Sequence, residues 1–215
     1  MSAALSLSHL HVELKGRVVV NDVSLTFARG SVTAIVGRSG AGKSVLMKAA
    51  AGLLMRSSGD VLLWAPPLVF VHQDPALIDD LDVLHNVMLP ARAQQRKSTD
   101  PWHWLAALSI DDVAHRLPCE LSPSQARRVA LARALMLKPG VLVVDEPTTG
   151  LDPDASDNVD DALCCVADAE RALIVITHHP RTLSRLRQLK DASVVVIDDG
   201  RARVVTTSMS SEVLA

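Results

Sequence analysis

The stretch Gly37–Ser44, which reads GRSGAGKS, constrains this chain more than any other. The apolar, β-branched run Val32–Val36 precedes it and is typical of a buried parallel strand. The run Val45–Ala51 follows it and is a good helix former, with Gly52 as its stop. A glycine loop between a strand and a helix lets backbone N–H groups turn inward around an anion, where the helix dipole also favours negative charge. The pattern therefore predicts a phosphate-binding loop.

The loop also carries the two side chains that a nucleotide needs. Lys43 is expected to reach the β- and γ-phosphates, and the Ser44 hydroxyl to ligate Mg²⁺. A glycine-rich turn that only happens to match is the alternative, and the flanking strand and helix argue against it. The expected nucleotide-binding residues are Gly37, Arg38, Ser39, Gly40, Ala41, Gly42, Lys43 and Ser44.

A second buried strand, Val141–Val144, ends in two carboxylates. Asp145 is expected to hold Mg²⁺, directly or through water, and Glu146 to polarise an attacking water molecule. An aspartate at this position could instead cap the next turn, but its pairing with the glycine loop favours the metal role. Gln73 and His178 end two further predicted strands. Because the ends of parallel strands gather at one edge of a sheet, we expect these side chains to meet there.

The order of strands and helices predicts an α/β fold with a mainly parallel sheet and helices on both faces. The N-terminal part, Leu5–Phe27, is expected to be antiparallel and β-rich, with separate strands at Leu5–Leu14, Val18–Val20 and Val23–Phe27. Residues 74–138 change character, because the pattern becomes helical and the strands stop. Within them, Arg92–Asp100 is polar and predicted to be a loop. A long helix is predicted from Ser122 to Lys138.

Composition limits the class of protein. Apolar residues make up 48% of 215, which indicates a folded domain with a sizeable core. The formal net charge of -2 argues against a nucleic-acid partner, because such proteins usually carry a basic face. No uninterrupted apolar run approaches the roughly 20 residues of a membrane span, and Met1–Leu14 lacks the pattern of a signal peptide. Cys119, Cys164 and Cys165 show no metal spacing and are predicted to be reduced and buried.

The order of these motifs resembles that of the nucleotide-binding subunit of ATP-binding-cassette (ABC) transporters, over essentially the whole chain. The matches are Gly37–Ser44 for the Walker A loop, Gln73 for the Q-loop, Leu121–Gln125 for the signature, Asp145 and Glu146 for Walker B with its catalytic carboxylate, Leu151-Asp152 for the D-loop and His178 for the switch histidine.

The resemblance implies a P-loop NTPase fold and a single ABC ATPase domain. Residues 1–73 and 139–215 would form its core with the β-subdomain, and residues 74–138 its inserted helical subdomain. It implies ATP and Mg²⁺ as cofactors, with His178 on the γ-phosphate and Gln73 both sensing that phosphate and ligating the metal. Glu146, His178 and Gln73 are the expected catalytic residues.

The resemblance also implies partners. Two subunits, most simply a homodimer, would pair head to tail. ATP would lie between one Walker A loop and the opposite signature residues Ser122, Ser124 and Gln125, with Asp152 in the D-loop. Separate transmembrane permease subunits would hold the pair on the inner, cytoplasmic face of the cell membrane.

Two positions depart from the family pattern. Pro123 and Ser124 stand where the family usually has two glycines; Ser122 and Gln125 still predict a capping box, with Pro123 tolerated as the first helical residue. Pro123 lacks the backbone N–H that a glycine would offer there. Ser124 is expected to bring a side chain close to the γ-phosphate of the opposite nucleotide. Leu14 stands where the family usually stacks an aromatic residue on adenine. A leucine recovers only part of the roughly 1–3 kcal/mol of stacking, so base selectivity should be poor.

The sequence leaves cargo open. The segment Pro75–Pro90 resembles phospholipid-trafficking and lipoprotein-releasing ATPases, which suggests lipid or lipoprotein traffic. One alternative is a soluble ABC ATPase acting on nucleic acid or ribosomes, although no coiled coil, zinc module or second cassette is present. Another is a regulatory half of a heterodimer with impaired turnover, prompted by Pro123 and Ser124. The presence of both Glu146 and His178 argues against that second alternative.

Overall fold

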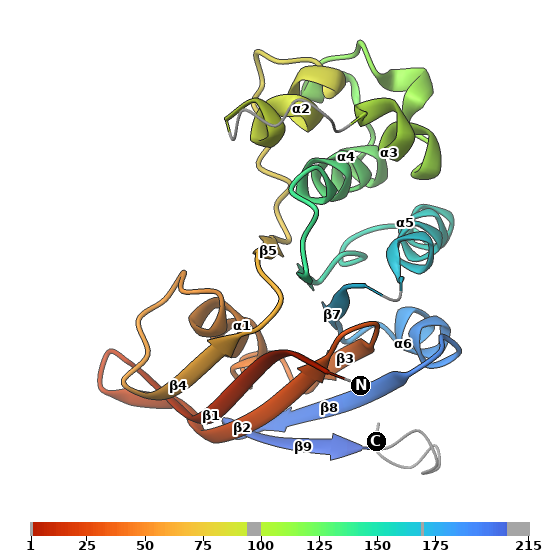
Figure 1. Cartoon of the computed structure of the whole chain (residues 1–215). Helices are drawn as coiled ribbons and strands as arrows, with labels where there is room; N and C mark the ends of the chain where they lie inside the picture. The colour runs from red at the N-terminus through yellow and green to blue at the C-terminus, as the bar shows by residue number, and fades with distance from the viewer. Residues whose placement is uncertain (1, 94–99, 169, 206–215) are drawn as a thin grey trace.

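Two β-sheets organise the computed structural model, which describes residues 2–93, 100–168 and 170–205 (Figure 1). The smaller sheet is antiparallel, with the strand order β2-β1-β4. The larger sheet has the order β5-β6-β7-β3-β8-β9, in which every neighbouring pair is parallel except β8 and β9. The predicted α/β class, with a mainly parallel sheet and an antiparallel N-terminal part, is confirmed.

The strands of the smaller sheet are β1 (Ala3–Leu14), β2 (Arg17–Ala28) and β4 (Ser58–Leu63); those of the larger sheet are β3 (Val32–Val36), β5 (Leu68–Val71), β6 (Val141–Asp145), β7 (Ala172–Ile176), β8 (Ala192–Asp198) and β9 (Arg201–Val205).

Strand β2 corrects the sequence prediction, which divided it in two. The chain continues through Asn21-Asp22 because Asp22 adopts a left-handed conformation (φ 55°) opposite an irregular part of β1, where the pairing register shifts. His9 of β1 also has a positive φ of 50°, and its Nδ1 lies 2.7 Å from an Asp22 carboxylate oxygen. Asn21 and Asp22 therefore form part of an irregular, bulged stretch, and the strand continues through them.

The helices are α1 (Lys43–Ala50), α2 (Val83–Ala93), α3 (Pro101–Ala107), α4 (Pro123–Leu135), α5 (Pro153–Val166) and α6 (Pro180–Arg187), with 3-10 turns at Asp111–Val113 and Pro118–Glu120. Four of them begin with proline, which suits the first helical position because its missing N–H has no partner there anyway. Helix α4 ends three residues before the predicted Lys138, which has a positive φ of 50°. Arg92 belongs to α2, and residues 94–99 of the predicted loop lie outside the described residues.

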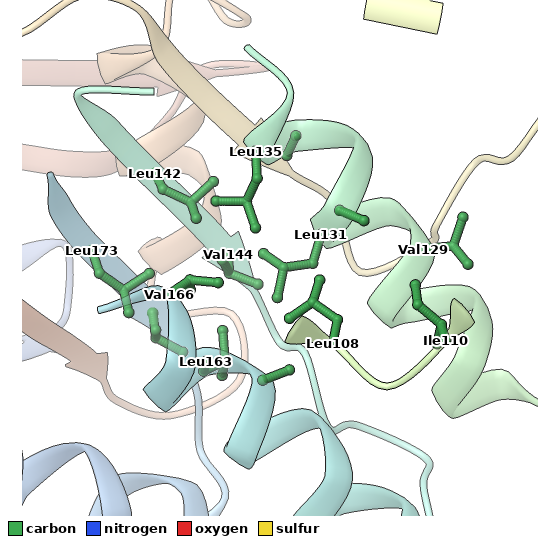
Figure 2. Packing of buried hydrophobic residues seen from close by; sticks show 14 of the residues in the cluster. Leu108, Ile110, Val129, Leu131, Leu135, Leu142, Val144, Leu163, Val166 and Leu173 are labelled. Carbon is green, nitrogen blue, oxygen red and sulfur yellow. The ribbon is translucent and has the colours of Figure 1, made fainter. Parts of the chain in front are cut away.

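The central sheet separates two hydrophobic clusters, because alternate side chains of its parallel strands point to opposite faces. Ile35 and Val143 pack with α1 and the smaller sheet, whereas Leu142 and Val144 pack with α4, α5 and α6. Figure 2 shows Leu131 and Leu135 of α4 facing Leu142 and Val144 of β6, with Leu163 of α5 beside them. Helices thus cover both faces of the sheet.

The helical segment shares its core with the sheet. In Figure 1, α2, α3 and α4 lie together at one end of the molecule, away from β1, β2 and β4. Yet Leu105 of α3 and Val87 of α2 belong to the same buried cluster as Leu142 of β6, joined through α4. The division into a core of residues 1–73 and 139–215 and a subdomain of residues 74–138 stays a prediction.

The cysteines differ from expectation. Cys119 and Cys165 are exposed and Cys164 is half-buried, so the prediction that all three are buried is wrong. Cys119 lies in a surface 3-10 turn, and Cys165 lies on the face of α5 opposite Leu163 and Val166, which take the core positions. Among the described helices, none is both long and apolar enough to cross a membrane.

Candidate nucleotide-binding site

The glycine loop joins β3 to α1 in the geometry that the sequence predicts. Gly42 adopts φ 99° directly before the first residue of α1, and a Cβ there would lie 2.6 Å from the carbonyl oxygen of Val19. At Gly37 (φ 147°) a Cβ would collide with the carbonyl oxygen of Ile197. Both positions accept only glycine, because side chains rarely adopt these angles and no space exists for them. The glycine loop therefore packs directly against the backbones of β2 and β8.

Lys43 is held inside the loop. Its ammonium donates to the carbonyl oxygens of Gly37 at 2.8 Å and Arg38 at 2.9 Å, and the residue is only 7% exposed. The ammonium therefore lies where the loop backbone would turn around the phosphates. Phosphate oxygens carry more negative charge than the two carbonyl oxygens and can replace them as its partners.

Ser44 and Asp145 form the second part of the site. The Ser44 hydroxyl donates to Oδ1 of Asp145 at 2.8 Å, so the start of α1 meets the end of β6. Asp145 is 5% exposed, and its burial raises the pKa of the carboxyl while the Ser44 hydrogen bond opposes that shift. A hydroxyl and a carboxylate oxygen side by side are the ligands that Mg²⁺ prefers, and a cation would offset the burial of the charge. The residues fit a magnesium ion.

His178 and Thr149 hold the Glu146 side chain through its two carboxylate oxygens. Nδ1 of His178 lies 2.9 Å from Oε1 and 2.8 Å from Oε2, and the Thr149 hydroxyl donates to Oε2 at 3.0 Å. Glu146 itself has a positive φ of 47°, and its N–H donates to the carbonyl oxygen of Ile176 in β7. Thr149 was not among the residues predicted for the site, although its position three residues after Glu146 in a turn was a usable signal.

One open cleft of about 500 Å³ brings most of the predicted residues together. It is lined by Val19, Gly37, Arg38, Ser39, Gly40, Gly42, Lys43, Ser44, Val45, Gln73, Glu146, Thr149 and His178. Asp145 joins Ser44 and Gln73 on the wall of an adjoining cleft. The strand ends thus meet the glycine loop at one edge of the sheet, as expected from the parallel order.

Other predicted residues lie elsewhere. Ala41 and Leu14 do not line this cleft and pack, half-buried, against the core cluster beneath the smaller sheet. The apolar residue of the β-rich part that does line it is Val19 of β2. Asp152 is exposed and caps α5 by accepting from the N–H of Ala155 at 2.8 Å. The structure therefore does not bring Leu14 to the cleft, and its contact with a base is unsupported.

The signature residues also lie outside the cleft, at the start of α4. The predicted capping box is confirmed: the Ser122 N–H donates to the Gln125 side chain at 2.9 Å, and the Gln125 N–H donates to the Ser122 hydroxyl at 3.2 Å. Ser124 is only 4% exposed, and its hydroxyl has no hydrogen-bond partner among the described residues. Its side chain is therefore turned into the protein, contrary to the expectation that it comes close to an opposite phosphate.

Comparison with known proteins decides the family. The family model for ABC transporters matches residues 20–149, which is more than half of the chain and includes the glycine loop, β6 and α4. The chain belongs to the ABC transporter family. As an ABC ATP-binding protein it is an ATPase, so the predicted fold and reaction class are both confirmed.

Relatives of this ABC ATPase include import subunits. The aliphatic sulfonates import ATP-binding protein SsuB 1 of Nocardia farcinica is 33% identical over 204 residues, which cover 94% of this chain and 81% of the relative. PhnT of Salmonella typhimurium, named as a candidate 2-aminoethylphosphonate import ATP-binding protein, is 31% identical over 94% of this chain and 60% of its own length. The chain therefore spans less than two thirds of that second relative.

A solved structure agrees in fold with this ABC ATPase. The cbiO1 subunit of Clostridium perfringens, part of the ABC transporter complex cbiONQ, superposes with a TM-score of 0.80 at 26% identity, over 96% of this chain and 89% of that one. Neither the two relatives nor this structure is named for lipid or lipoprotein traffic, so the comparisons give the predicted lipid cargo no support.

Proposed function

We propose that this ATPase binds ATP with Mg²⁺ in the cleft at the edge of the central sheet and uses hydrolysis to drive a separate membrane permease. The observation that carries the proposal is the meeting of the glycine loop, Asp145, Glu146 and His178 at one edge of one sheet. The ABC family match supports the permease as a partner.

Each side chain has a role that its geometry supports. Lys43 and the N–H groups of the loop would hold the β- and γ-phosphates, while Ser44, Asp145 and Gln73 would hold Mg²⁺. Glu146 would accept the proton of the attacking water. His178 and Thr149 fix both oxygens of that carboxylate, which leaves little reorganisation for the reaction. Bound Mg²⁺ would neutralise charge on the phosphate oxygens.

A second subunit would complete the site. Ser122 and Gln125 at the start of α4 do not line the cleft of their own chain, and the capping box leaves Ser122 and Pro123 exposed. In a head-to-tail pair these residues would face the nucleotide of the other subunit. We take a homodimer as the simplest pair.

For cargo, we propose import of a small organic anion of the sulfonate or phosphonate kind. The support is the printed function of the relatives SsuB 1 and PhnT, both import subunits. Transport by such a system would place the ATPase on the cytoplasmic face of the membrane, at its permease. The likeness of Pro75–Pro90 to lipid-handling ATPases is the weaker guide, because in such a system that segment would face the permease and not the cargo.

Hydrolysis assays test the proposal. The purified protein should hydrolyse ATP only with Mg²⁺, and Lys43→Ala should bind ATP about tenfold to a hundredfold more weakly, because charge-assisted phosphate contacts are worth roughly 1.5–3 kcal/mol. The matched control is Lys190→Ala, which removes an exposed lysine that does not line the cleft. Equal ATP affinity in the two variants would contradict the assigned site.

Co-purification tests the partners. Membrane chains that purify with the protein should include a permease, identified by mass spectrometry, and nucleic acid should not bind at physiological salt. Specific binding of nucleic acid, with no permease recovered, would favour the soluble alternative. Normal ATP binding without turnover in the unmodified protein would favour the regulatory half of a heterodimer.

A further inference from the structure

Helix α4 carries three arginines that donate to backbone carbonyls of three different loops. Arg128 donates to Leu108 and Ser109, both at 2.8 Å, and so stays within the helical segment. Arg133 donates to Ala76 at 2.9 Å and to Pro75 at 2.7 Å, in the loop that follows Gln73. Arg127 donates to the loop that follows Glu146. None of the three forms an ion pair with a carboxylate of the described residues.

The Arg127 contacts are short and involve both ends of the guanidinium fork. Nη1 donates to the carbonyl oxygen of Pro147 at 2.6 Å, and Nη2 donates to that of Thr149 at 2.6 Å. A longer contact of 3.5 Å joins Nη1 to the carbonyl oxygen of Glu146. The planar fork therefore fixes two carbonyls that are two residues apart, which a flexible ammonium cannot do in the same way.

The loop that Arg127 holds positions the proposed catalytic carboxylate. Glu146 begins it at a positive φ, a conformation that persists only where the surroundings hold it. Thr149 ends the clamped segment, and its hydroxyl holds Oε2 of Glu146. Within the loop, the N–H of Thr149 reaches the Glu146 carbonyl only at 3.4 Å. The guanidinium thus supplies the shortest hydrogen bonds that the structure gives to this turn.

The signature lies at the N-terminal start of α4, the same end of the helix that carries Arg127. Arg127 lies two residues after Gln125, the last residue of that motif, on a helix whose start is fixed by a capping box. A displacement of α4 would therefore move the signature and pull on the carbonyls of Pro147 and Thr149 together. The same rigid helix would carry the signature toward the nucleotide of the opposite subunit and hold the Pro147–Thr149 turn of its own subunit.

We propose that Arg127 is a positioning residue for hydrolysis, which aligns Glu146 by clamping the Pro147–Thr149 turn to α4. This inference rests on the proposed role of Glu146. It assigns no contact between Arg127 and the substrate; the guanidinium acts through the backbone of the turn and the Thr149 hydroxyl.

Steady-state kinetics of Arg127→Met test the role. We expect kcat to fall by about tenfold to a hundredfold, because a small misplacement of a catalytic group has effects of that size, while KM for ATP changes by less than about threefold. Arg127→Lys should recover part of the loss, since an ammonium reaches one carbonyl but not both. Arg127→Gln is the second variant if the methionine protein does not fold.

The matched control is Arg128→Met, with Arg128→Lys in reserve if that variant does not fold. It removes an arginine of the same helix whose partners, Leu108 and Ser109, lie far along the chain from the turn. Thermal stability should fall, but kcat per folded subunit should stay within about twofold. A merely structural role for Arg127 would give the same result as this control, and that outcome would overturn the proposal.

Amide hydrogen exchange separates this inference from the proposed function. In nucleotide-free protein, the amides of residues 148–151 should exchange at least severalfold faster in Arg127→Met than in the unmodified chain or the Arg128 control. If the unmodified protein fails to hydrolyse ATP, the proposed function fails, yet exchange still decides whether Arg127 holds the turn. Unchanged exchange of these amides in Arg127→Met would overturn the proposed clamp, whatever the value of kcat.

Discussion

At the scale of single residues, Glu146 is the side chain whose removal should be most informative. Glu146→Gln keeps the size of the side chain and the Thr149 contact but loses the base, so we expect ATP binding to persist and turnover to fall by at least about a hundredfold. Release of phosphate measures turnover, and sedimentation with ATP measures persistence of the nucleotide-bound dimer. Hydrolysis at the unmodified rate would show that another group activates the water.

Selectivity for the base also belongs to single residues. Neither phenylalanine nor tryptophan lines the cleft, and the chain contains no tyrosine. We therefore expect ATP and GTP to bind within a few fold of one another, because base stacking on an aromatic side chain is worth roughly 1–3 kcal/mol and is missing here. Equilibrium titration with both nucleotides checks this. A hundredfold preference for ATP would indicate an unrecognised contact with the adenine.

At the scale of the element, the start of α4 offers a matched pair of serine variants. Ser122→Ala removes the capping hydroxyl and should lower the free energy of unfolding by about 1 kcal/mol. Ser124→Ala, two residues later, removes a buried hydroxyl without a partner and should leave that free energy unchanged or raise it slightly.

Urea denaturation of both variants measures the difference. An equal loss in the two would mean that the Ser124 hydroxyl is satisfied in solution, for example by an ordered water molecule. Ser122 is the N-cap residue with an extended backbone, so helix propensity acts only at Ser124, where it slightly favours alanine. The same serine-to-alanine change is therefore expected to have different effects at the two positions.

At the scale of the whole molecule, one buried carboxyl joins three elements. Asp160 of α5 is 2% exposed and accepts from the Thr182 hydroxyl of α6 at 3.1 Å, and Thr182 lies 3.2 Å from the Thr148 hydroxyl in the turn after β6. Oδ1 of Asp160 has no hydrogen-bond partner among the described residues. Burial raises the pKa of Asp160, partly offset by the Thr182 hydrogen bond. Arg185 and His179 also oppose this effect of burial on the Asp160 carboxyl, and Arg185 is already paired with Asp161.

This pKa shift has a defined effect on stability. The folded chain keeps the Asp160 proton to a higher pH than the unfolded chain, so the stability that the group contributes is full below the unfolded pKa and is lost as pH rises through the folded pKa. Asp160→Asn cannot ionise. Its free energy of unfolding, relative to the unmodified chain, should be highest at pH 7 and decline toward pH 4. Denaturation at several pH values measures this, and a difference independent of pH would contradict a raised pKa.

The sequence by itself determined the local parts of this protein. The glycine loop, the apolar strands β3, β6 and β7 and the capping box at Ser122 follow from short-range rules, because backbone angles, alternation and hydrogen bonds within four residues act on neighbours in the chain. The gathering of Ser44, Asp145 and Gln73 was also predictable, since parallel strands share one edge.

Tertiary structure alone decided the contacts between segments far apart in the chain. The family resemblance placed Leu14 at the base, yet Val19 of β2 is the residue of the smaller sheet that lines the cleft. The Ser124 side chain was expected close to the opposite γ-phosphate, but the packing of α4 buries it. The clamp of Arg127 on Pro147 and Thr149 joins residues about twenty positions apart. Such contacts depend on how whole elements pack against one another. A local sequence pattern cannot predict them, because the close packing of the core involves residues from all parts of the chain.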